Sequence, residues 1–345
     1  MVSKKFKITA LGCRTNQYEA QAFTDQLLAL GYEAAAEGEP ADLCIVNTCT
    51  VTASADSSSR HEIRKLASDN PHAPIYVTGC YAERDPKAVK DLPNVAGVIP
   101  NQDKEALIKA LFPDAESLPE FNIERFEAHT RAFVKVQDGC NSFCTYCIIP
   151  YVRGRSRSRE ASDIIQEVER LVSNGFKEIV LTGINIGDFD GGAVKSNLAE
   201  LTRLVDAVEG VERVRISSID PDEVDDDLLD AVVNGKKTCQ SMHIVLQSGS
   251  NVVLKRMNRK YTRQMFLETC ERLRTASPDF TFTTDVIVGF PGETEEDHKE
   301  TLKILEEVRF AKVHMFPYSD RPRTRASLYP NKVDNGAKAR RKQEV

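Results

Sequence analysis

The first 115 residues alternate between short apolar runs and longer stretches in which apolar residues recur every three or four positions. The run at 41–51 is almost continuously apolar, as expected for a strand buried on both faces. Helical patterns follow at 17–30 and after the Ser/Asp-rich opening at 54–59. Strands that alternate with helices predict a doubly wound parallel sheet. The strand candidates are 6–12, 41–51, 74–80 and 95–100.

The second half repeats this alternation with six strand candidates. Six βα units in roughly 190 residues favour a partial (βα)6 barrel over a complete eightfold one. Turn-forming residues without a sustained period fill 113–130 and place the domain boundary there. The barrel strand candidates are 132–137, 178–183, 213–218, 241–247, 281–290 and 311–319. We therefore expect an α/β protein with an N-terminal domain (1–115), a linker (116–130), a barrel (131–330) and a basic tail (331–345).

Composition narrows the class of protein. The chain has 345 residues, 41% hydrophobic and 28% charged, which is ordinary for a soluble enzyme. No apolar stretch approaches the length of a membrane span, so we expect a cytoplasmic protein without a membrane partner. Thiols stay reduced in that compartment, and nine cysteines there indicate metal or redox chemistry before disulfides.

The net charge of −6 argues against nonspecific nucleic-acid binding over the whole surface. Local basic patches can still bind nucleic acid. The alternative for each patch is a charged face that only contacts solvent. Residues 320–345 hold eight Lys/Arg against three acids. A shorter stripe consists of Arg153, Arg155, Arg157 and Arg159.

Cys140, Cys144 and Cys147 lie in the loop after the first predicted barrel strand, where active sites of α/β folds are found. Their spacing lets three thiolates face one cluster. A 4Fe–4S cube normally takes four cysteine ligands, so three would leave one iron open for a small molecule. The alternative is a zinc site completed by a distant Cys or His, although no His lies in this loop.

Cys13, Cys49 and Cys80 each end a different predicted parallel strand, so the three could converge on one edge of the sheet. A buried cysteine often serves as a small hydrophobe, which would explain any one of them but fits all three poorly. We expect Cys44, inside the apolar strand, to be a core residue, and Cys239 and Cys270 to have structural or incidental roles.

The string QDGCNSFCTYCIIPYVRGRSRSR (137–159) resembles the radical S-adenosylmethionine (SAM) enzymes, and among them the methylthiotransferases. LGCRTNQYE, NTCTVT and TGCYAE resemble the N-terminal domain of that family, and the resemblance covers about residues 5 to 330. It implies two 4Fe–4S clusters, one on each cysteine set, with SAM on the open iron of the barrel cluster. Reductive cleavage of SAM then gives a 5′-deoxyadenosyl radical, and the second cluster carries or delivers sulfur. The family's electron donor is a flavodoxin or ferredoxin.

The same resemblance suggests contacts with SAM in three further strings: LTGINIGDF (181–189), HIVLQSGS (243–250) and VGFPGET (288–294). A plain turn is an equal competitor for the glycines of the first string. No catalytic residue is assigned. The candidate cofactor contacts are Gly183, Asn185, Gln247, Gly289 and Pro291.

LGCRTNQYE, QDGCNSFCTYCIIP and LTGINIGDF look most like the class that acts on threonylcarbamoyladenosine-37 of tRNA. The implied reaction converts C–H to C–SCH3 at C2 of that purine and uses two SAM molecules. The arginine stripe would then contact phosphates of the anticodon loop. The alternatives are isopentenyladenosine-37 of tRNA, an aspartate of ribosomal protein S12, another type of radical SAM enzyme, and a non-enzymatic RNA-binding protein with structural zinc.

Two departures from the family pattern stand out. The family normally ends with a TRAM domain, and this sequence stops at KARRKQEV, where the linking helix would begin, so we expect that domain to be absent from the chain. Arg323 and Arg325 stand where the family more often shows a glycine and a proline. They could contact phosphate or mark a mobile end.

The acidic run DPDEVDDD (220–227) lacks EF-hand spacing and predicts a solvated helix start.

Overall fold

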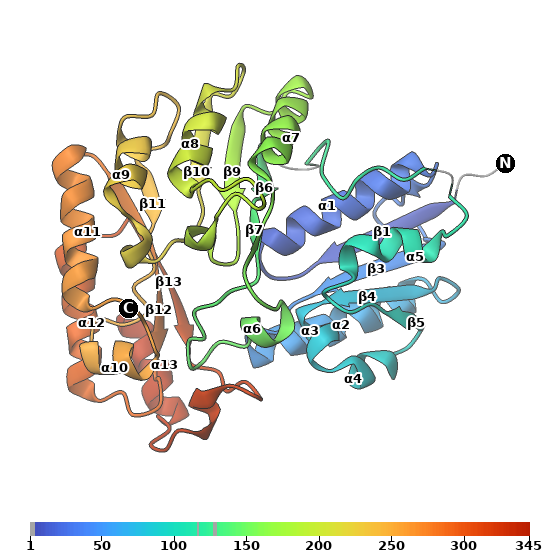
Figure 1. Ribbon diagram of the computed structural model, residues 1–345. Coiled ribbons are helices and arrows are strands. Elements are labelled where there is room, and N and C mark those ends of the chain that lie inside the picture. The colour runs from blue at the N-terminus through green and yellow to red at the C-terminus, as the bar shows by residue number, and fades with distance from the viewer. Residues whose placement is uncertain (1–3, 116, 127–129) are drawn as a thin grey trace.

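The computed structural model describes residues 4–115, 117–126 and 130–345, which form two α/β units side by side (Figure 1). The N-terminal unit holds a five-stranded parallel sheet in the order β2-β1-β3-β4-β5. Its strands are β1 (Lys5–Ala10), β2 (Glu33–Ala34), β3 (Leu43–Thr48), β4 (Ile75–Gly79) and β5 (Val95–Val98). Its helices are α1 (Arg14–Ala29), α2 (Ala53–Asp69), α3 (Cys80–Arg84), α4 (Pro86–Lys90) and α5 (Leu107–Leu111).

The central strand β3 is buried along its whole length because helices cover both faces of the sheet. Leu43 and Ile45 pack on the side of α1, against Phe23. Cys44 lies on the opposite face, where it packs in one cluster with Ile63 of α2. Successive side chains of a strand point to opposite faces, which explains the unbroken apolar run and makes Cys44 a core residue, as predicted.

The C-terminal unit contains six parallel strands in two three-stranded groups, β10-β9-β6 and β11-β12-β13. Isolated parallel bridges, Val214 to Thr238 and Ile219 to Ile244, join the two groups. Among the described residues no ladder joins β13 to β6, so the barrel stays open and the predicted partial barrel is confirmed. The strands are β6 (Arg131–Lys135), β9 (Glu178–Thr182), β10 (Arg213–Ile216), β11 (Ser241–His243), β12 (Thr281–Val288) and β13 (Lys312–Pro317).

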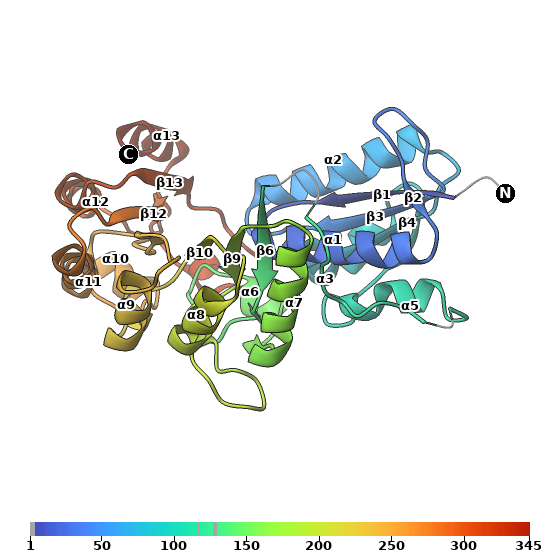
Figure 2. The same cartoon turned by 90° about the horizontal axis from the view of Figure 1, so that it is seen from above.

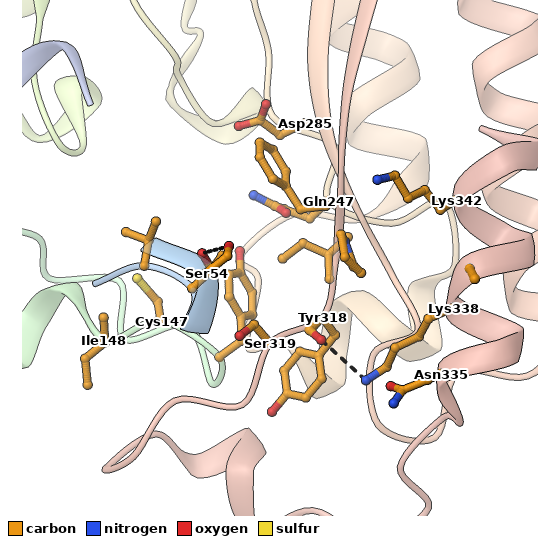
Figure 3. Close-up of a pocket in the computed structure, with 17 residues that line it drawn as sticks. Ser54, Cys147, Ile148, Gln247, Asp285, Tyr318, Ser319, Asn335, Lys338 and Lys342 are labelled. Carbon is orange, nitrogen blue, oxygen red and sulfur yellow. Dashed lines mark hydrogen bonds between the residues drawn. The ribbon is translucent and has the colours of Figure 1, made fainter. Parts of the chain in front are cut away.

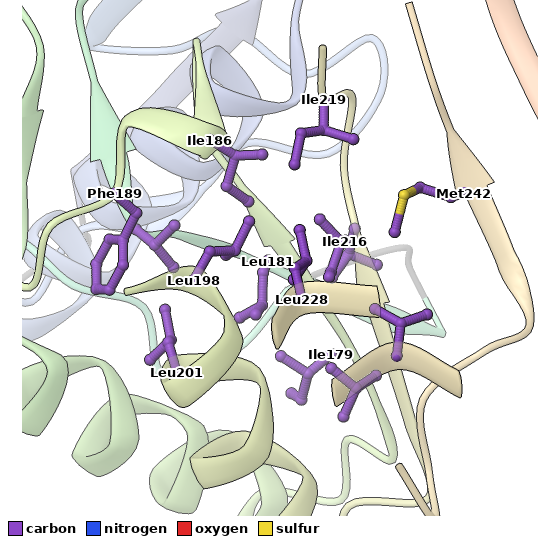
Figure 4. Packing of buried hydrophobic residues seen from close by; sticks show 14 of the residues in the cluster. Ile179, Leu181, Ile186, Phe189, Leu198, Leu201, Ile216, Ile219, Leu228 and Met242 are labelled. Carbon is purple, nitrogen blue, oxygen red and sulfur yellow. The ribbon is translucent and has the colours of Figure 1, made fainter. Parts of the chain in front are cut away.

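Helices cover the outer face of these strands (Figure 1) and contribute side chains to the core. Leu198 and Leu201 of one helix pack against Ile179 and Leu181 of β9 (Figure 4). The helices are α6 (Ile149–Val152), α7 (Ala161–Ser173), α8 (Leu198–Ala207), α9 (Asp226–Val233), α10 (Asn251–Arg256), α11 (Arg263–Ala276), α12 (Glu295–Val308) and α13 (Asn335–Glu344). Within the described ranges, no helix combines the length and the apolar character that crossing a membrane requires.

The structure departs from the expected elements at two places in the barrel. The fourth strand ends at His243 instead of 247, and beyond it only an isolated bridge from Gln247, whose backbone is left-handed (φ 61°), to Val286 continues the pairing with β12. A short antiparallel pair, β7 (Gln137–Asp138) with β8 (Arg157–Ser158), closes the base of the cysteine loop. Two-residue strands carry no periodicity, so the sequence gives no sign of this pair.

Residues 331–345, expected as a basic tail, contain helix α13, which packs beside α12 and β13 (Figure 2). Arg341 is buried there and its Nη1 donates to Glu293 Oε1 at 2.6 Å. Another arginine of the C-terminal segment reaches the first unit: Arg321 Nη1 donates to Asp56 Oδ2 at 2.7 Å and to Thr50 O at 3.2 Å. These buried charge pairs hold the end of the chain against both units.

Candidate active site

The N-terminal thiols lie where three neighbouring strands end. Cys13 follows β1, Cys49 follows β3 and Cys80 follows β4, and these strands are adjacent in the sheet. Gly12 has φ 90°, and a Cβ at this position would lie 2.6 Å from Cys49 Sγ, so only glycine allows the backbone this close. Burial raises the pKa of Cys49 to about 12, with smaller effects from the neighbouring Cys80 and Cys13. The predicted convergence is therefore present in the fold.

The barrel thiols lie in the loop that β7 and β8 close. The Cys140 amide donates to Gly154 O at 3.2 Å, and the Thr145 amide donates to Met257 O at 2.9 Å. Cys144 Sγ accepts from Arg259 Nη1 at 3.0 Å, and Arg259 also pairs with Asp220. Arg259 therefore places a buried positive charge at the thiol loop.

All six cysteines are free of disulfides. In the part of the chain that the structure describes, no three His, Cys, Asp or Glu side chains stand close enough to share a single metal ion. A 4Fe–4S cube takes each thiolate on a different iron, so its ligands occupy separate corners. Burial and neighbouring thiols raise the pKa of Cys147, and such thiols stay protonated until iron replaces the proton. Two sets of three sulfur donors fit two clusters.

Buried charges join the two units between these thiol sets. Arg153 Nη1 donates to Asp138 Oδ1 at 2.7 Å and to Glu19 Oε1 at 3.2 Å. Lys104 Nζ lies 2.5 Å from Glu19 Oε1 and 2.8 Å from Asp138 Oδ2. Burial alone would raise the pKa of Glu19, but Arg153 and Lys104 outweigh it and hold the pKa at about 2. Lys135 Nζ lies 3.8 Å from Glu19 Oε1 and 4.0 Å from Asp138 Oδ2, so two carboxylates and three cations form a charge cluster with almost no solvent contact.

The arginine stripe does not face solvent as a whole. Arg155 and Arg157 are exposed, whereas Arg153 is 3% exposed inside the charge cluster. Arg159 Nη1 donates to Glu167 Oε2 at 2.6 Å and to Tyr18 OH at 3.1 Å. The prediction that Arg153 and Arg159 contact RNA phosphates is wrong, because buried carboxylates already neutralise both. For Arg155 and Arg157 it stays a prediction.

Gly183 and Asn185 follow β9 at the carboxyl end of the barrel strands. Gln137 Oε1 accepts from the amides of Ile184 and Asn185, both at 3.0 Å. Asn185 Nδ2 donates to Glu223 Oε1 at 2.9 Å. Gln137 and Glu223 support this turn, and sequence reasoning missed both of them. Glu223 lies in the acidic run, which does start helix α9 through the Asp225 N-cap but also turns one carboxyl inward.

A cavity of about 840 Å³ opens beside Cys147 (Figure 3). Cys147 lies on one side of it and Lys338 and Lys342 of α13 lie on the other. Gln247 also lines the cavity, and its Oε1 is buried without a hydrogen-bond partner among the described atoms. An acceptor left in this state suits a ligand that brings a hydroxyl or amine donor.

Both units contribute to the cavity wall. Val51, Thr52 and Ser54 come from the N-terminal unit, and the Ala53 amide donates to Ser319 Oγ at 3.1 Å across the interface. The barrel contributes an aromatic and aliphatic surface with one carboxylate: Tyr146, Ile148, Asp285, Ile287, Phe316, Pro317 and Tyr318.

The other four predicted cofactor contacts do not line this cavity. Gly183 and Asn185 belong to the turn after β9. Gly289 and Pro291 belong to the turn after β12, where the Gly289 amide donates to Glu293 Oε1 at 3.1 Å. The structure therefore brings only Gln247 of the five to the cavity beside the thiols.

Titration of Glu223 should make the stability of the folded protein depend on pH. Burial, and secondly Asp220, raise the pKa of Glu223 from 4.5 to about 7. Folding therefore favours the protonated carboxyl, and this contribution is complete below about pH 4.5 and lost as the pH rises through 7. Between pH 5 and pH 8, the free energy of unfolding of the metal-free parent protein should fall. We expect this fall to be roughly 2–3 kcal/mol larger in the parent than in Glu223→Gln. Denaturant unfolding at each pH measures it.

The exposed neighbour Asp222 provides the matched control. Asp222 is the last of the causes that raise the pKa of Glu223, so Asp222→Asn should keep most of the pH dependence of the parent protein, whereas Glu223→Gln removes the part that comes from this carboxyl. An equal pH dependence in the parent and in Glu223→Gln would show that this carboxyl does not titrate as described.

Comparison with known proteins matches each of the two units to a different family. Residues 134–305 match the Radical SAM superfamily, and residues 5–100 match the uncharacterized protein family UPF0004. The chain is 52% identical over 335 residues to the threonylcarbamoyladenosine tRNA methylthiotransferase MtaB of Chlamydia pneumoniae, covering 97% of this chain and 79% of the relative. It is 34% identical to the tRNA-2-methylthio-N(6)-dimethylallyladenosine synthase of Carboxydothermus hydrogenoformans, covering 100% and 83%.

Among solved structures, the radical SAM methyltransferase TsrM of Kitasatospora setae matches with a TM-score of 0.66. Its sequence is 14% identical, and the match covers 95% of this chain and 77% of that one, so it supports the fold. The cofactors of such enzymes are 4Fe–4S clusters and SAM, for which the two thiol sets are suitable. Because curated relatives match nearly its whole length, this chain belongs to the radical SAM methylthiotransferase family.

Proposed function

We propose that this enzyme converts N6-threonylcarbamoyladenosine at position 37 of tRNA to its 2-methylthio derivative, with one SAM as radical source and a second as methyl donor. The substrate assignment rests on sequence identity, which is higher to a threonylcarbamoyladenosine enzyme than to a dimethylallyladenosine enzyme. The chain is 52% identical to the threonylcarbamoyladenosine enzyme of Chlamydia pneumoniae and 34% identical to the dimethylallyladenosine enzyme of Carboxydothermus hydrogenoformans.

The charges of the cavity support the same substrate class. Lys338 and Lys342 lie on the wall opposite Cys147, and Lys342 has no carboxylate partner among the described residues (Figure 3). A threonylcarbamoyl group carries a carboxylate, whereas an isopentenyl group is apolar. Two ammonium groups in a largely apolar cavity therefore favour the charged substituent.

The residues of the chain take separate roles in this proposal. Cys140, Cys144 and Cys147 hold the cluster that, when bound, supplies the electron for SAM cleavage, and the N-terminal thiols hold the cluster that supplies sulfur. Gln247 offers its free Oε1 to the cofactor. The walls from both units exclude water from the reacting atoms.

The electron donor in this proposal is a flavodoxin or ferredoxin, and the tRNA anticodon loop is the other partner. We place the reaction in the cytoplasm because tRNA is modified there. The isopentenyl and ribosomal S12 substrates remain the alternatives within the family.

The experiment compares product formation on tRNA that carries each precursor at position 37. We expect the reconstituted enzyme with SAM, reductant and a sulfur source to give a 2-methylthio nucleoside from the threonylcarbamoyl substrate at least tenfold faster than from the isopentenyl one, which corresponds to about 1.4 kcal/mol. Mass spectrometry of digested tRNA measures both rates. Modification of the isopentenyl substrate alone, or of S12 alone, would contradict the assignment.

A further inference from the structure

Four side chains contact one another in a row on the surface beside the barrel thiols. In order they are Arg155, Phe143, Tyr151 and Arg323, and this row is called the stack below. The Arg155 guanidinium lies 4.4 Å from the Phe143 ring centroid, and the Arg323 guanidinium lies 5.3 Å from that of Tyr151. The two rings meet edge to face, with centroids 6.3 Å apart. Aromatic rings attract guanidinium groups and restrict their movement, so both arginines are held with their N–H edges free.

Both Phe143 and Arg323 have left-handed backbones, with φ 48° and 72°. This conformation favours glycine, and it is unusual for a bulky residue. A side chain that keeps a strained backbone here indicates a contact that compensates for the strain.

The charges of this stack, and of the nearby Arg325, are not neutralised by any carboxylate among the described residues. In the described residues Arg155, Arg323 and Arg325 form no ion pair with a carboxylate, although Arg321, two residues away, pairs with Asp56. Three unpaired guanidiniums on one face of an acidic protein suit a polyanion, because each guanidinium binds a phosphate through two parallel hydrogen bonds.

The stack lies next to the proposed active site. Phe143, Tyr151 and Arg325 line a second cavity of about 200 Å³. Cys147 lines both this cavity and the larger one. A strand that crosses the small cavity therefore reaches the large one within a short distance.

We propose that Arg323, together with Arg155 and Arg325, binds phosphates of the substrate RNA next to its target nucleotide, while Phe143 and Tyr151 hold two of the guanidiniums in place. This inference rests on the proposed function for the identity of the RNA. Arg323 and Arg325 take the first of the two roles that the sequence left open for them. An acidic electron-donor protein is the other polyanionic partner, and the test separates it from RNA.

The test uses Arg323→Gly, which relieves the left-handed backbone while it removes the charge. The reconstituted protein is titrated into a fluorescein-labelled RNA hairpin with the sequence of a tRNA anticodon arm, at several KCl concentrations. We expect about fivefold to tenfold weaker binding than in the parent protein. The slope of log K against log salt should decrease by about 0.7, as expected for one lost phosphate contact to a single strand.

Arg309→Gly is the matched control. Arg309 is exposed, has φ 53° and precedes β13, so it lies at the opposite end of the barrel strands. Both variants should melt at or above the temperature of the parent protein, and Arg309→Gly should bind RNA like the parent.

Equal affinity and salt slope in Arg323→Gly and the parent would overturn the proposal. So would a parent protein that does not bind the hairpin, or a variant that binds RNA normally but accepts electrons more slowly from a flavodoxin. If Arg323 proves necessary for RNA binding while no tRNA precursor is modified, the phosphate contact stands and the proposed function fails.

Discussion

Replacing Arg153 by methionine is expected to lower the free energy of unfolding by about 3–5 kcal/mol. Methionine is unbranched like the arginine stem, but it leaves Glu19 and Asp138 with one cation fewer in a site that excludes solvent. Removing one partner from a buried ion cluster costs far more than the cluster itself contributes, because the remaining charge stays desolvated. Urea unfolding of the metal-free protein at pH 7 under reducing conditions measures the change.

Arg157→Met is the matched control, since Arg157 belongs to the same stripe but is exposed. It should change the free energy of unfolding by no more than about 0.5 kcal/mol. Similar values for the two variants would show that Arg153 does not carry the interface as the contacts indicate.

Changing Cys13, Cys49 and Cys80 together to alanine is expected to lower the iron content from about eight to about four atoms per chain after anaerobic reconstitution. The barrel thiols are separate in the fold and should keep their own cluster. The variant should also lose all 2-methylthio product while it still cleaves SAM, because the remaining cluster suffices for that step. Iron and sulfide assays, with product analysis, measure the three quantities.

Cys239→Ala is the control for this experiment, because Cys239 is half-buried and far in sequence from both thiol sets. It should keep the full iron content. About four irons in both the parent and the triple variant would indicate a single cluster, and the proposed function would then have to be withdrawn.

The positions of the two thiol sets in the fold could be predicted because they depend on local rules. Each N-terminal cysteine follows an apolar strand, and parallel strands bring their carboxyl ends to one edge. The partial barrel was predictable for the same reason, since its six parallel strands and the long helices between them each carry their own pattern of apolar residues.

The arginine stripe shows where local rules fail. Arg153 and Arg155 look alike in the sequence, yet one is buried and the other exposed. The difference depends on Glu19, which lies 134 residues earlier and reaches Arg153 only in the folded chain. Glu223 was missed for a similar reason, because its acidic neighbours indicate a solvated helix start and only the contact with Asn185 shows its inward position.

The contact between Arg321 and Asp56 has a consequence for how the protein is made. These residues are 265 positions apart, so the ribosome needs on the order of ten seconds to a minute to add the second after the first. During that time Asp56 has only Arg84 as a cation, and the carbonyl of Thr50, next to Cys49, lacks the donor from Arg321. The nascent N-terminal unit therefore completes this contact with the C-terminal segment only late in synthesis, when nearly the whole barrel has been made.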